Sequence, residues 1–170
     1  HHSVGNAAFL SRLGGGEVFC PGFLTVVHFL SRLCGGEEVF ALEEARFTGL
    51  KLDFDTEMYH AVERCDRFHC LVMRENGKAI GFHWLFTTPM MRHKGYVHAH
   101  TDAIFVLPEH RKHSAKLLEY STQYIKERAS FWTLANLQAK DNSKLWQHKG
   151  FESIETIMFK KLGVSIHAPV

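Results

Sequence analysis

Histidine and aspartate alternate along one short segment, His98-Ala-His-Thr-Asp102, and these residue types can carry out proton transfer. If the segment is a β-strand, its two-residue period places His98, His100 and Asp102 on one face. The ordinary pKa of histidine lies near physiological pH, so His100 is our first candidate for a general base. Asp102 could act through water or by orienting a histidine. Alternatively, these side chains are polar groups on a solvated strand face.

The same spacing allows a metal site, because a His-x-His pair on a strand can bind zinc when further ligands converge on it. No second His-x-His pair occurs among the remaining histidines. We therefore assign no metal from the sequence and keep a histidine-based metal site as an alternative.

A second segment, Val106–Lys116, runs from a strand-forming stretch through Pro108 into a basic, helix-forming stretch. A helix N-terminus carries unpaired N–H groups and a positive dipole end, which suit a phosphate or pyrophosphate. Arginine can hold two phosphate oxygens in fork geometry, lysine acts as a point charge, and serine adds a hydroxyl donor. A solvated helix start would normally be acidic, so the basic turn favours an anion ligand. The candidate residues are Arg111, Lys112, His113, Ser114 and Lys116.

The spacing of apolar and turn-forming residues predicts the elements that position these segments. Helices are predicted at 39–47, from the N-cap Asp55 to Asp66, at Lys112–Arg128 and at Asn142–His148. Strands are predicted at Phe68–Arg74, Ala79–Thr87, Tyr96–Leu107, Phe131–Ala139 and Phe151–Lys160. The first two strands are joined by a hairpin at Glu75–Lys78, and Gly150 is expected to be left-handed. An antiparallel meander followed by strand–helix–strand–helix–strand predicts an α/β (α+β) fold, with a mixed, mostly antiparallel sheet flanked by helices.

Composition limits the class of protein. The 170 residues suit one domain, and 45% hydrophobic with 22% charged residues is ordinary for a soluble globular chain. A formal net charge of +2 gives no reason to expect a nucleic-acid partner. The four cysteines lack CxxC spacing, and no stretch has the length of a membrane span or the pattern of a signal peptide. We expect a cytoplasmic protein that does not bind membranes.

The N-terminal part contains a duplication, because Phe9-Leu-Ser-Arg-Leu13 recurs as Phe29-Leu-Ser-Arg-Leu33. We divide the chain into this segment of unknown role (1–36), a main domain (37–163) and a tail (164–170). One apolar part of the N-terminal segment, such as 23–28, could supply a first strand. The segment could also cover a sheet edge or the partner subunit of a homodimer.

Two stretches, Ala103–Leu118 and Asn142–Phe151, resemble the strand, Val-x-Pro-Glu-x-Arg turn, helix and Gly-Phe of the GNAT (N-acetyltransferase) superfamily. The resemblance covers roughly residues 37–162. It implies a GNAT-like sheet, acetyl-CoA as cosubstrate, and transfer of the acetyl group to a primary amine by direct attack on the thioester. The acetyl-CoA and the amine-bearing acceptor are then the expected partners.

The resemblance also implies which residues bind the cosubstrate. The pantetheine arm would lie along the backbone of Ile104, Phe105 and Val106, where this strand parts from its parallel neighbour, and Asn136 could contact it at the gap. The pyrophosphate would lie at the basic turn, where Ala115 takes a small-residue position. The family's glycines are replaced here by Ser114 and Lys116.

The catalytic residues implied are a base, with His100 first and Asp102 second, and an acid for the leaving thiolate. Many family members use a tyrosine for the acid, but Trp146 stands at that position. The proton could instead come from Tyr124, from Tyr120, from His148 or from water. The changed turn and Trp146 also allow an alternative, an inactive GNAT-fold module that binds CoA or another protein.

Overall fold

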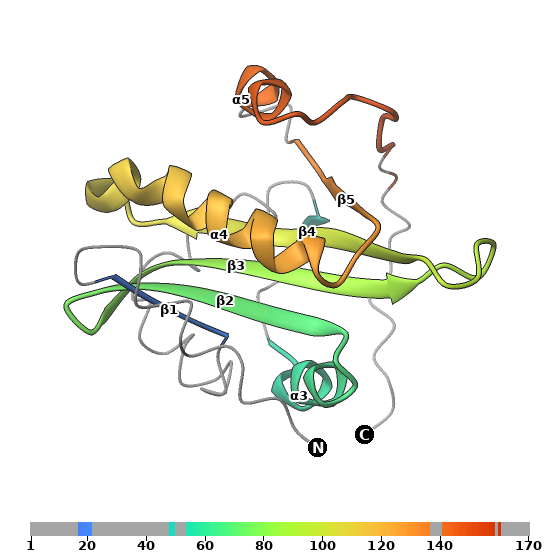
Figure 1. Cartoon of the computed structure of the whole chain (residues 1–170), viewed down its shortest axis with the longest axis horizontal. Helices are drawn as coiled ribbons and strands as arrows, with labels where there is room; N and C mark the ends of the chain where they lie inside the picture. The colour runs from blue at the N-terminus through green and yellow to red at the C-terminus, as the bar shows by residue number, and fades with distance from the viewer. Residues whose placement is uncertain (1–16, 22–47, 50–53, 137–140, 159, 161–170) are drawn as a thin grey trace.

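The computed structural model describes residues 17–21, 48–49, 54–136, 141–158 and 160 (Figure 1). Within these residues, the strands form one sheet in the order β1-β2-β3-β4-β5. They are β1 (Glu17–Pro21), β2 (Phe68–Glu75), β3 (Lys78–Pro89), β4 (Val97–Val106) and β5 (Phe131–Leu134). Neighbouring strands are antiparallel except β4 and β5, which are parallel. The predicted mixed, mostly antiparallel sheet is therefore confirmed.

The helical elements described are α3 (Thr56–Arg64), η2 (Pro108–His113), α4 (Ser114–Lys126) and α5 (Ser143–His148). Helix α3 begins as predicted, because the Asp55 Oδ1 atom accepts a hydrogen bond from the Met58 amide at 2.9 Å. The predicted helix over 112–128 is confirmed as α4, but a 3-10 helix, η2, precedes it. The helix predicted over 39–47 lies outside the described residues. No helix in the described part of the chain is long and apolar enough to cross a membrane.

The two faces of the sheet bury different clusters, because side chains alternate along each strand. On one face, Phe68 and Trp84 are buried and α3 packs over them through Tyr59 and Val62. On the other face, the buried residues of α4 pack on β2, β3 and β4. The cluster residues on that side are Leu71, Met73, Ile80, Leu85, Ala99, Val106, Leu117 and Ile125. Figure 1 shows α4 lying along the sheet, over β3 and β4.

A chain of polar groups crosses the core on the α4 face. The Trp132 indole N–H donates to the Thr101 Oγ1 atom at 2.8 Å, and the Ser121 hydroxyl donates to the Leu117 carbonyl at 2.8 Å. His83 lies between them, with Nε2 2.9 Å from Thr101 Oγ1 and Nδ1 2.7 Å from Ser121 Oγ. Because Ser121 has already given its proton to Leu117, His83 Nδ1 must donate and Nε2 must accept from Thr101. The chain thus ties α4, β3, β4 and β5 together through one neutral imidazole.

The β2–β3 hairpin forms at the predicted Asn-Gly pair, with positive φ angles of 50° at Asn76 and 79° at Gly77. These are the angles of a type I′ turn, whose twist matches that of the strands. The hairpin is followed by Gly81, where β3 lies close to β4. A Cβ atom added to Gly81 would lie 2.9 Å from the Phe105 carbonyl oxygen and 3.1 Å from Val106 Cγ2.

Replacing Gly81 by alanine should therefore lower the free energy of unfolding by on the order of 1 kcal/mol, because the added methyl forces β3 and β4 apart. Urea denaturation at neutral pH would measure the change. Thr88→Ala, at an exposed position of the same strand, is the matched control and should change stability little. Equal stability of the Gly81→Ala and wild-type proteins would contradict the close approach of the two strands.

Three predictions at the edges of the sheet need correction or comment. The final strand predicted over 151–160 is wrong, because residues 151–158 form no regular element. Its apolar residues Ile154, Ile157 and Met158 do not alternate with a period of two, and all three are exposed. β5 ends at Leu134, short of the predicted Ala139, and residues 137–140 lie outside the described part. The first strand is Glu17–Pro21, which joins part of the N-terminal segment to β2, whereas 23–28 is not described.

Candidate active site

The parallel strands β4 and β5 pair only from His98↔Phe131 to Thr101↔Leu134, although β4 continues to Val106. Among the described residues, no strand pairs with this side of β4 beyond Thr101. Figure 1 shows β5 turning away from β4 toward α5. A groove of about 1110 Å³ opens here, lined by residues of β4, β5, α4, α5 and the segment 149–157. From β4 it is lined by His98 and His100, so the groove lies beside the paired stretch that ends where the two strands part.

Two histidines of β4 line the groove and share one hydroxyl group. The Thr133 Oγ1 atom lies 2.6 Å from His98 Nε2 and 3.0 Å from His100 Nδ1. A hydroxyl can donate only one proton, so it donates to one imidazole and accepts from the other. This bridge fixes both ring orientations. His100 lies opposite Thr133, one residue before the last β4–β5 pair, and is the closer of the two histidines to the point where the strands part.

The surroundings of His98 favour its neutral form. Partial burial and then the nearby His100 lower the pKa of His98, while the carboxylate of Glu155 acts in the opposite direction. The ring is also stacked on Phe131, with centroids 4.7 Å apart and an interplanar angle of 16°. Glu119, Glu152 and Glu155 add carboxylates to the groove wall, which suits a positively charged amine.

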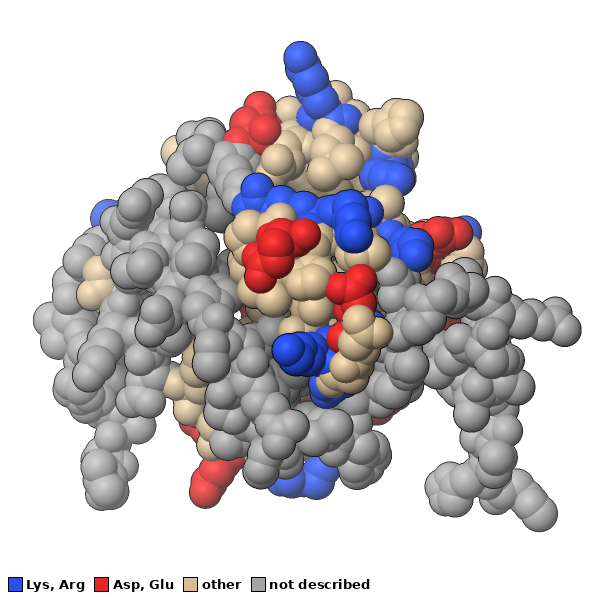
Figure 2. Space-filling view, turned by 90° about the vertical axis from the view of Figure 1, so that its left-hand side faces the viewer, with Lys and Arg blue, Asp and Glu red and all other residues tan. Residues whose placement is uncertain are grey.

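The basic turn lies at the other end of β4. Arg111, Lys112 and Lys116 are exposed there, and Figure 2 shows Lys and Arg side chains gathered in a band across this end of the molecule. The backbone is wound into η2, so the His110 amide donates to the Leu107 carbonyl at 2.8 Å and the Ser114 amide donates to the Arg111 carbonyl. These two amides are already paired. An anion at this turn would therefore be bound more by side chains, and less by backbone amides, than the sequence predicted.

A family model described as "Acetyltransferase (GNAT) family" matches residues 37–151 of the chain. The chain belongs to the GNAT family of acetyltransferases. The match includes β2 to β5, α3, α4 and α5, and so contains the basic turn and the groove lining up to Phe151; the lining residues 152–157 lie beyond it. A search of curated proteins found no match.

Solved structures support the GNAT fold. An aminoglycoside acetyltransferase from an uncultured soil metagenomic sample is 15% identical, with a TM-score of 0.65 over 89% of this chain and 100% of its own. A ribosomal-protein-alanine N-acetyltransferase from Brucella melitensis biovar Abortus 2308 is 18% identical, with a TM-score of 0.61 over 86% of this chain and 98% of its own. A GNAT family acetyltransferase from Staphylococcus aureus is 15% identical, with a TM-score of 0.61 over 87% and 100%. At these identities the likeness concerns the fold.

The structure brings together some of the predicted residues of this GNAT protein. The groove is lined by His98, His100, Ala115, Asn136 and Trp146. Asn136 also bonds to the residues just before α5: it donates from Nδ2 to Asp141 Oδ1 at 2.8 Å, and its Oδ1 atom accepts from the Asn142 amide at 3.1 Å. Trp146 packs edge-on against Phe151, with ring centroids 5.8 Å apart.

Other predicted residues lie elsewhere. Asp102 is exposed and does not line the groove. It lies at a β-bulge, because Thr101 pairs with Leu85 and Ala103 pairs with Trp84, which leaves no β3 residue opposite Asp102. The side chains of Ile104 and Phe105 pack against the core on the two faces of the sheet, whereas the contacts predicted for these residues use their backbone atoms. His113 is buried and faces Glu75 rather than the groove.

Tyr124 lies on the sheet side of α4, away from the groove-lining residues. The Thr87 hydroxyl donates to the Asp66 carbonyl at 3.1 Å, so it accepts from His69 Nε2 at 3.1 Å. His69 Nδ1 must then accept the proton of the Tyr124 hydroxyl, 3.0 Å away. Burial raises the pKa of Tyr124, and the Arg128 guanidinium lies 3.7 Å from its ring centroid. The Tyr124 hydroxyl proton is therefore engaged in a hydrogen bond to His69 and points away from the groove.

Sequence reasoning missed Thr133, the residue that joins the two histidines. Its position in an alternating strand was a usable signal, because Thr133 and Phe131 share a face. The missing information was the parallel register of β4 and β5, which no local pattern in either strand specifies.

Proposed function

We propose that this GNAT protein is an acetyl-CoA-dependent N-acetyltransferase in which a primary amine attacks the thioester directly. The observation that carries the proposal is the parting of β4 and β5 beside a groove lined by the His98–Thr133–His100 bridge. The pantetheine arm would lie along the backbone of Ile104, Phe105 and Val106. Its thioester would then lie near His100.

The chemistry assigned to each group follows from this placement. His100, helped by Thr133 and His98, takes a proton from the acceptor's ammonium group before the attack, or from the amine nitrogen as it adds, directly or through one water molecule. The amine nitrogen forms a bond to the acetyl carbon, the carbon–sulfur bond breaks, and the CoA thiolate leaves with a proton from solvent or from the histidine bridge. In this proposal Asp102 and Tyr124 do not contact the reacting atoms, because neither lines the groove. The groove carboxylates attract the cationic acceptor.

The pyrophosphate of acetyl-CoA is proposed to bind at the turn that joins η2 to α4. Because two of the amides there are paired within the helix, Arg111 and Lys112 supply the principal contacts, with Ser114 and Lys116 beside them. Ala115 lines the groove next to this turn and leaves room for the cosubstrate. Asn136 closes the opposite wall.

Replacing Arg111 by alanine should weaken acetyl-CoA binding about 10- to 100-fold, because a charge-assisted hydrogen bond contributes about 1.5–3 kcal/mol. Isothermal titration calorimetry with acetyl-CoA would measure it. Arg64→Ala, an exposed arginine in the last turn of α3, is the matched control and should leave affinity unchanged. Equal affinity of the Arg111→Ala and wild-type proteins would contradict the assignment of the turn.

Turnover tests the activity itself. Release of free CoA should be measured with acceptors of two kinds, an aminoglycoside and a peptide with N-terminal alanine, which two of the structural neighbours are named for. CoA release that depends on the acceptor would support the proposal. Saturable binding of acetyl-CoA without turnover on any amine would favour the inactive binding module instead. No binding at saturating acetyl-CoA would rule out both.

A further inference from the structure

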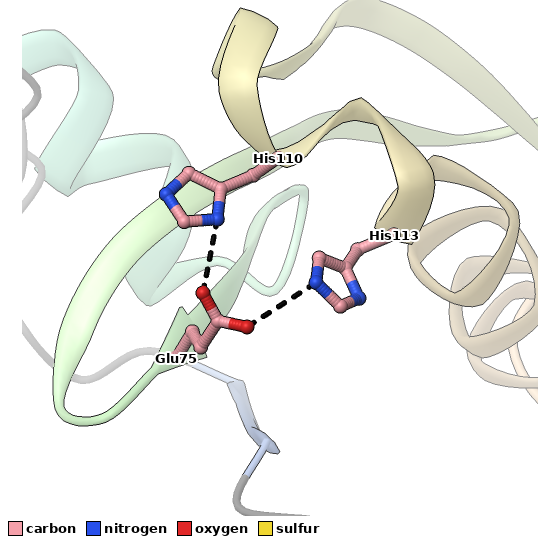
Figure 3. A group of neighbouring side chains, drawn as sticks. All are labelled: Glu75, His110 and His113. Carbon is pink, nitrogen blue, oxygen red and sulfur yellow. Dashed lines mark ion pairs between the residues drawn. The ribbon is translucent and has the colours of Figure 1, made fainter.

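Three side chains that can bind a metal ion meet at the end of the sheet, apart from the groove (Figure 3). Glu75 is the last residue of β2, just before the hairpin turn, and His110 and His113 belong to η2. A 3-10 helix has three residues per turn, so residues three apart lie on the same side. The two imidazole rings are accordingly stacked, with centroids 6.3 Å apart and an interplanar angle of 29°.

The donor atoms of these side chains converge. His110 Nδ1 lies 2.9 Å from Glu75 Oε2, and His113 Nε2 lies 3.2 Å from Glu75 Oε1. One ligand atom from each residue can be chosen so that all lie within 4.8 Å of one another. Two ligands held at about 2.1 Å from a tetrahedral ion lie about 3.4 Å apart. Only small side-chain movements would therefore be needed to close the group around an ion.

The kind of metal follows from the donors. Two imidazole nitrogens and one carboxylate form a borderline donor set that suits zinc and its neighbours in the first transition row. Calcium and magnesium prefer oxygen ligands throughout, so this site would bind them poorly. A three-residue set leaves a fourth position for water. The side chains of Glu75, His110 and His113 are 29%, 26% and 11% exposed, so solvent can reach the site although it is partly desolvated.

The backbone holds the ligands in place before any ion arrives. Glu75 pairs with Lys78 in β3 and with Glu17 in β1, so it is fixed on both sides by the sheet. The start of η2 is anchored to the sheet because the Leu107 amide donates to the Ile80 carbonyl at 2.9 Å. Such preorganisation lowers the entropy lost when ligands gather around a metal. Arg111 and Lys112, which stand between the two histidines in sequence, are exposed and lie on other sides of the 3-10 helix.

We propose that Glu75, His110 and His113 form a binding site for one divalent ion of the zinc class, which clamps η2 to the β2–β3 hairpin. The site is separate from the His98–Thr133–His100 bridge. The proposal does not depend on acetyl transfer. Its effect is to hold the turn between β4 and α4 in a fixed position relative to the sheet.

The test is titration of the chelator-treated full chain with Zn²⁺ in competition with a chromogenic chelator. We expect one equivalent to bind with a Kd of about a micromolar or below. Glu75→Gln keeps the shape of the side chain and His110→Ala removes a half-exposed ring, so both variants should fold. Each should weaken binding at least tenfold, because three ligands are reduced to two. His93→Ala, in the exposed β3–β4 loop, and His98→Ala, in the groove, should retain wild-type affinity.

A second readout uses the melting temperature. Zinc at a hundredfold excess over its Kd should raise the melting temperature of the wild-type protein by several degrees, and that of Glu75→Gln much less. The proposal is overturned if the wild-type chain binds no stoichiometric zinc. It is also overturned if Glu75→Gln and His110→Ala bind zinc as the wild type does, or if His98→Ala is the variant that loses it.

Discussion

Replacing His100 by alanine should slow acetyl transfer about 100-fold or more, the usual loss when a general base is removed. His100 lines the groove next to the last paired residues of β4 and β5, and Thr133 holds its ring. The affinity for acetyl-CoA should not change, because the proposed cosubstrate contacts lie beyond Thr101 and at the basic turn. Steady-state kinetics would give kcat, and calorimetry would give the Kd for acetyl-CoA.

Two further variants locate the effect within the bridge. Thr133→Val keeps the shape of the side chain but removes the hydroxyl that both histidines contact, so it should cause a smaller loss of kcat than His100→Ala. His93→Ala, in the exposed β3–β4 loop, should leave kcat unchanged. An unchanged kcat in the His100→Ala variant would show that His100 is not the base. A parallel loss of acetyl-CoA affinity would show instead that the substitution damaged the cosubstrate site.

Acidification from pH 7 to pH 5 should lower the free energy of unfolding by about 2 kcal/mol through His83 alone. Burial lowers the pKa of His83 to about 3, and its side chain is fully buried between Ser121 and Thr101. In the unfolded chain this histidine has an ordinary pKa of about 6.5, so below that pH the unfolded state binds a proton that the folded state does not. The stabilisation is therefore complete above pH 6.5 and is lost progressively as the pH falls toward 3. His69, whose pKa is also lowered by burial, adds to the loss in the same direction.

Urea denaturation at several pH values would measure this dependence. His83→Gln removes the titrating group but can still donate to Ser121 and accept from Thr101, so its stability should fall less between pH 7 and pH 5 than that of the wild type. His148→Gln should retain the wild-type pH dependence, because His148 is exposed. If the His83→Gln and wild-type proteins lost the same free energy over this range, another group would have to be responsible.

The sequence predicted the elements whose causes are local. The Asn76-Gly77 turn, the Asp55 N-cap and the left-handed Gly150 each follow from the preferences of a few neighbouring residues, and all are confirmed. The prediction of a final strand failed because it relied on the apolar content of residues 151–160, although Ile154, Ile157 and Met158 do not alternate with a period of two. The alternation of His98 and His100 predicted a shared face, and both histidines do line the groove. Their bridge through Thr133 depends on the register between strands more than 30 residues apart in sequence, which local reasoning cannot supply.

Side-chain direction on the helical elements was also hidden in the sequence. His113 was grouped with Arg111 and Lys112 because the three are adjacent and basic, but the 3-10 winding of η2 turns His113 inward to Glu75. Tyr124 was a candidate proton donor because Trp146 stands at the position of the family's tyrosine, yet the rotation of α4 directs the Tyr124 hydroxyl to His69. The directions of both side chains depend on how the helix is rotated about its axis relative to the sheet, and tertiary packing decides that rotation.

The early end of the β4–β5 pairing has an evolutionary consequence. The edge of β4 beyond Thr101 offers main-chain N–H and C=O groups, and every residue type except proline supplies both. Recognition through main-chain groups does not restrict which side chains the strand carries. This is compatible with solved structures of the same fold that are only 13–18% identical in sequence. For an inhibitor that copies the pantetheine arm and binds along this strand as we propose for the cosubstrate, point mutations there would rarely remove its main-chain hydrogen-bonding partners.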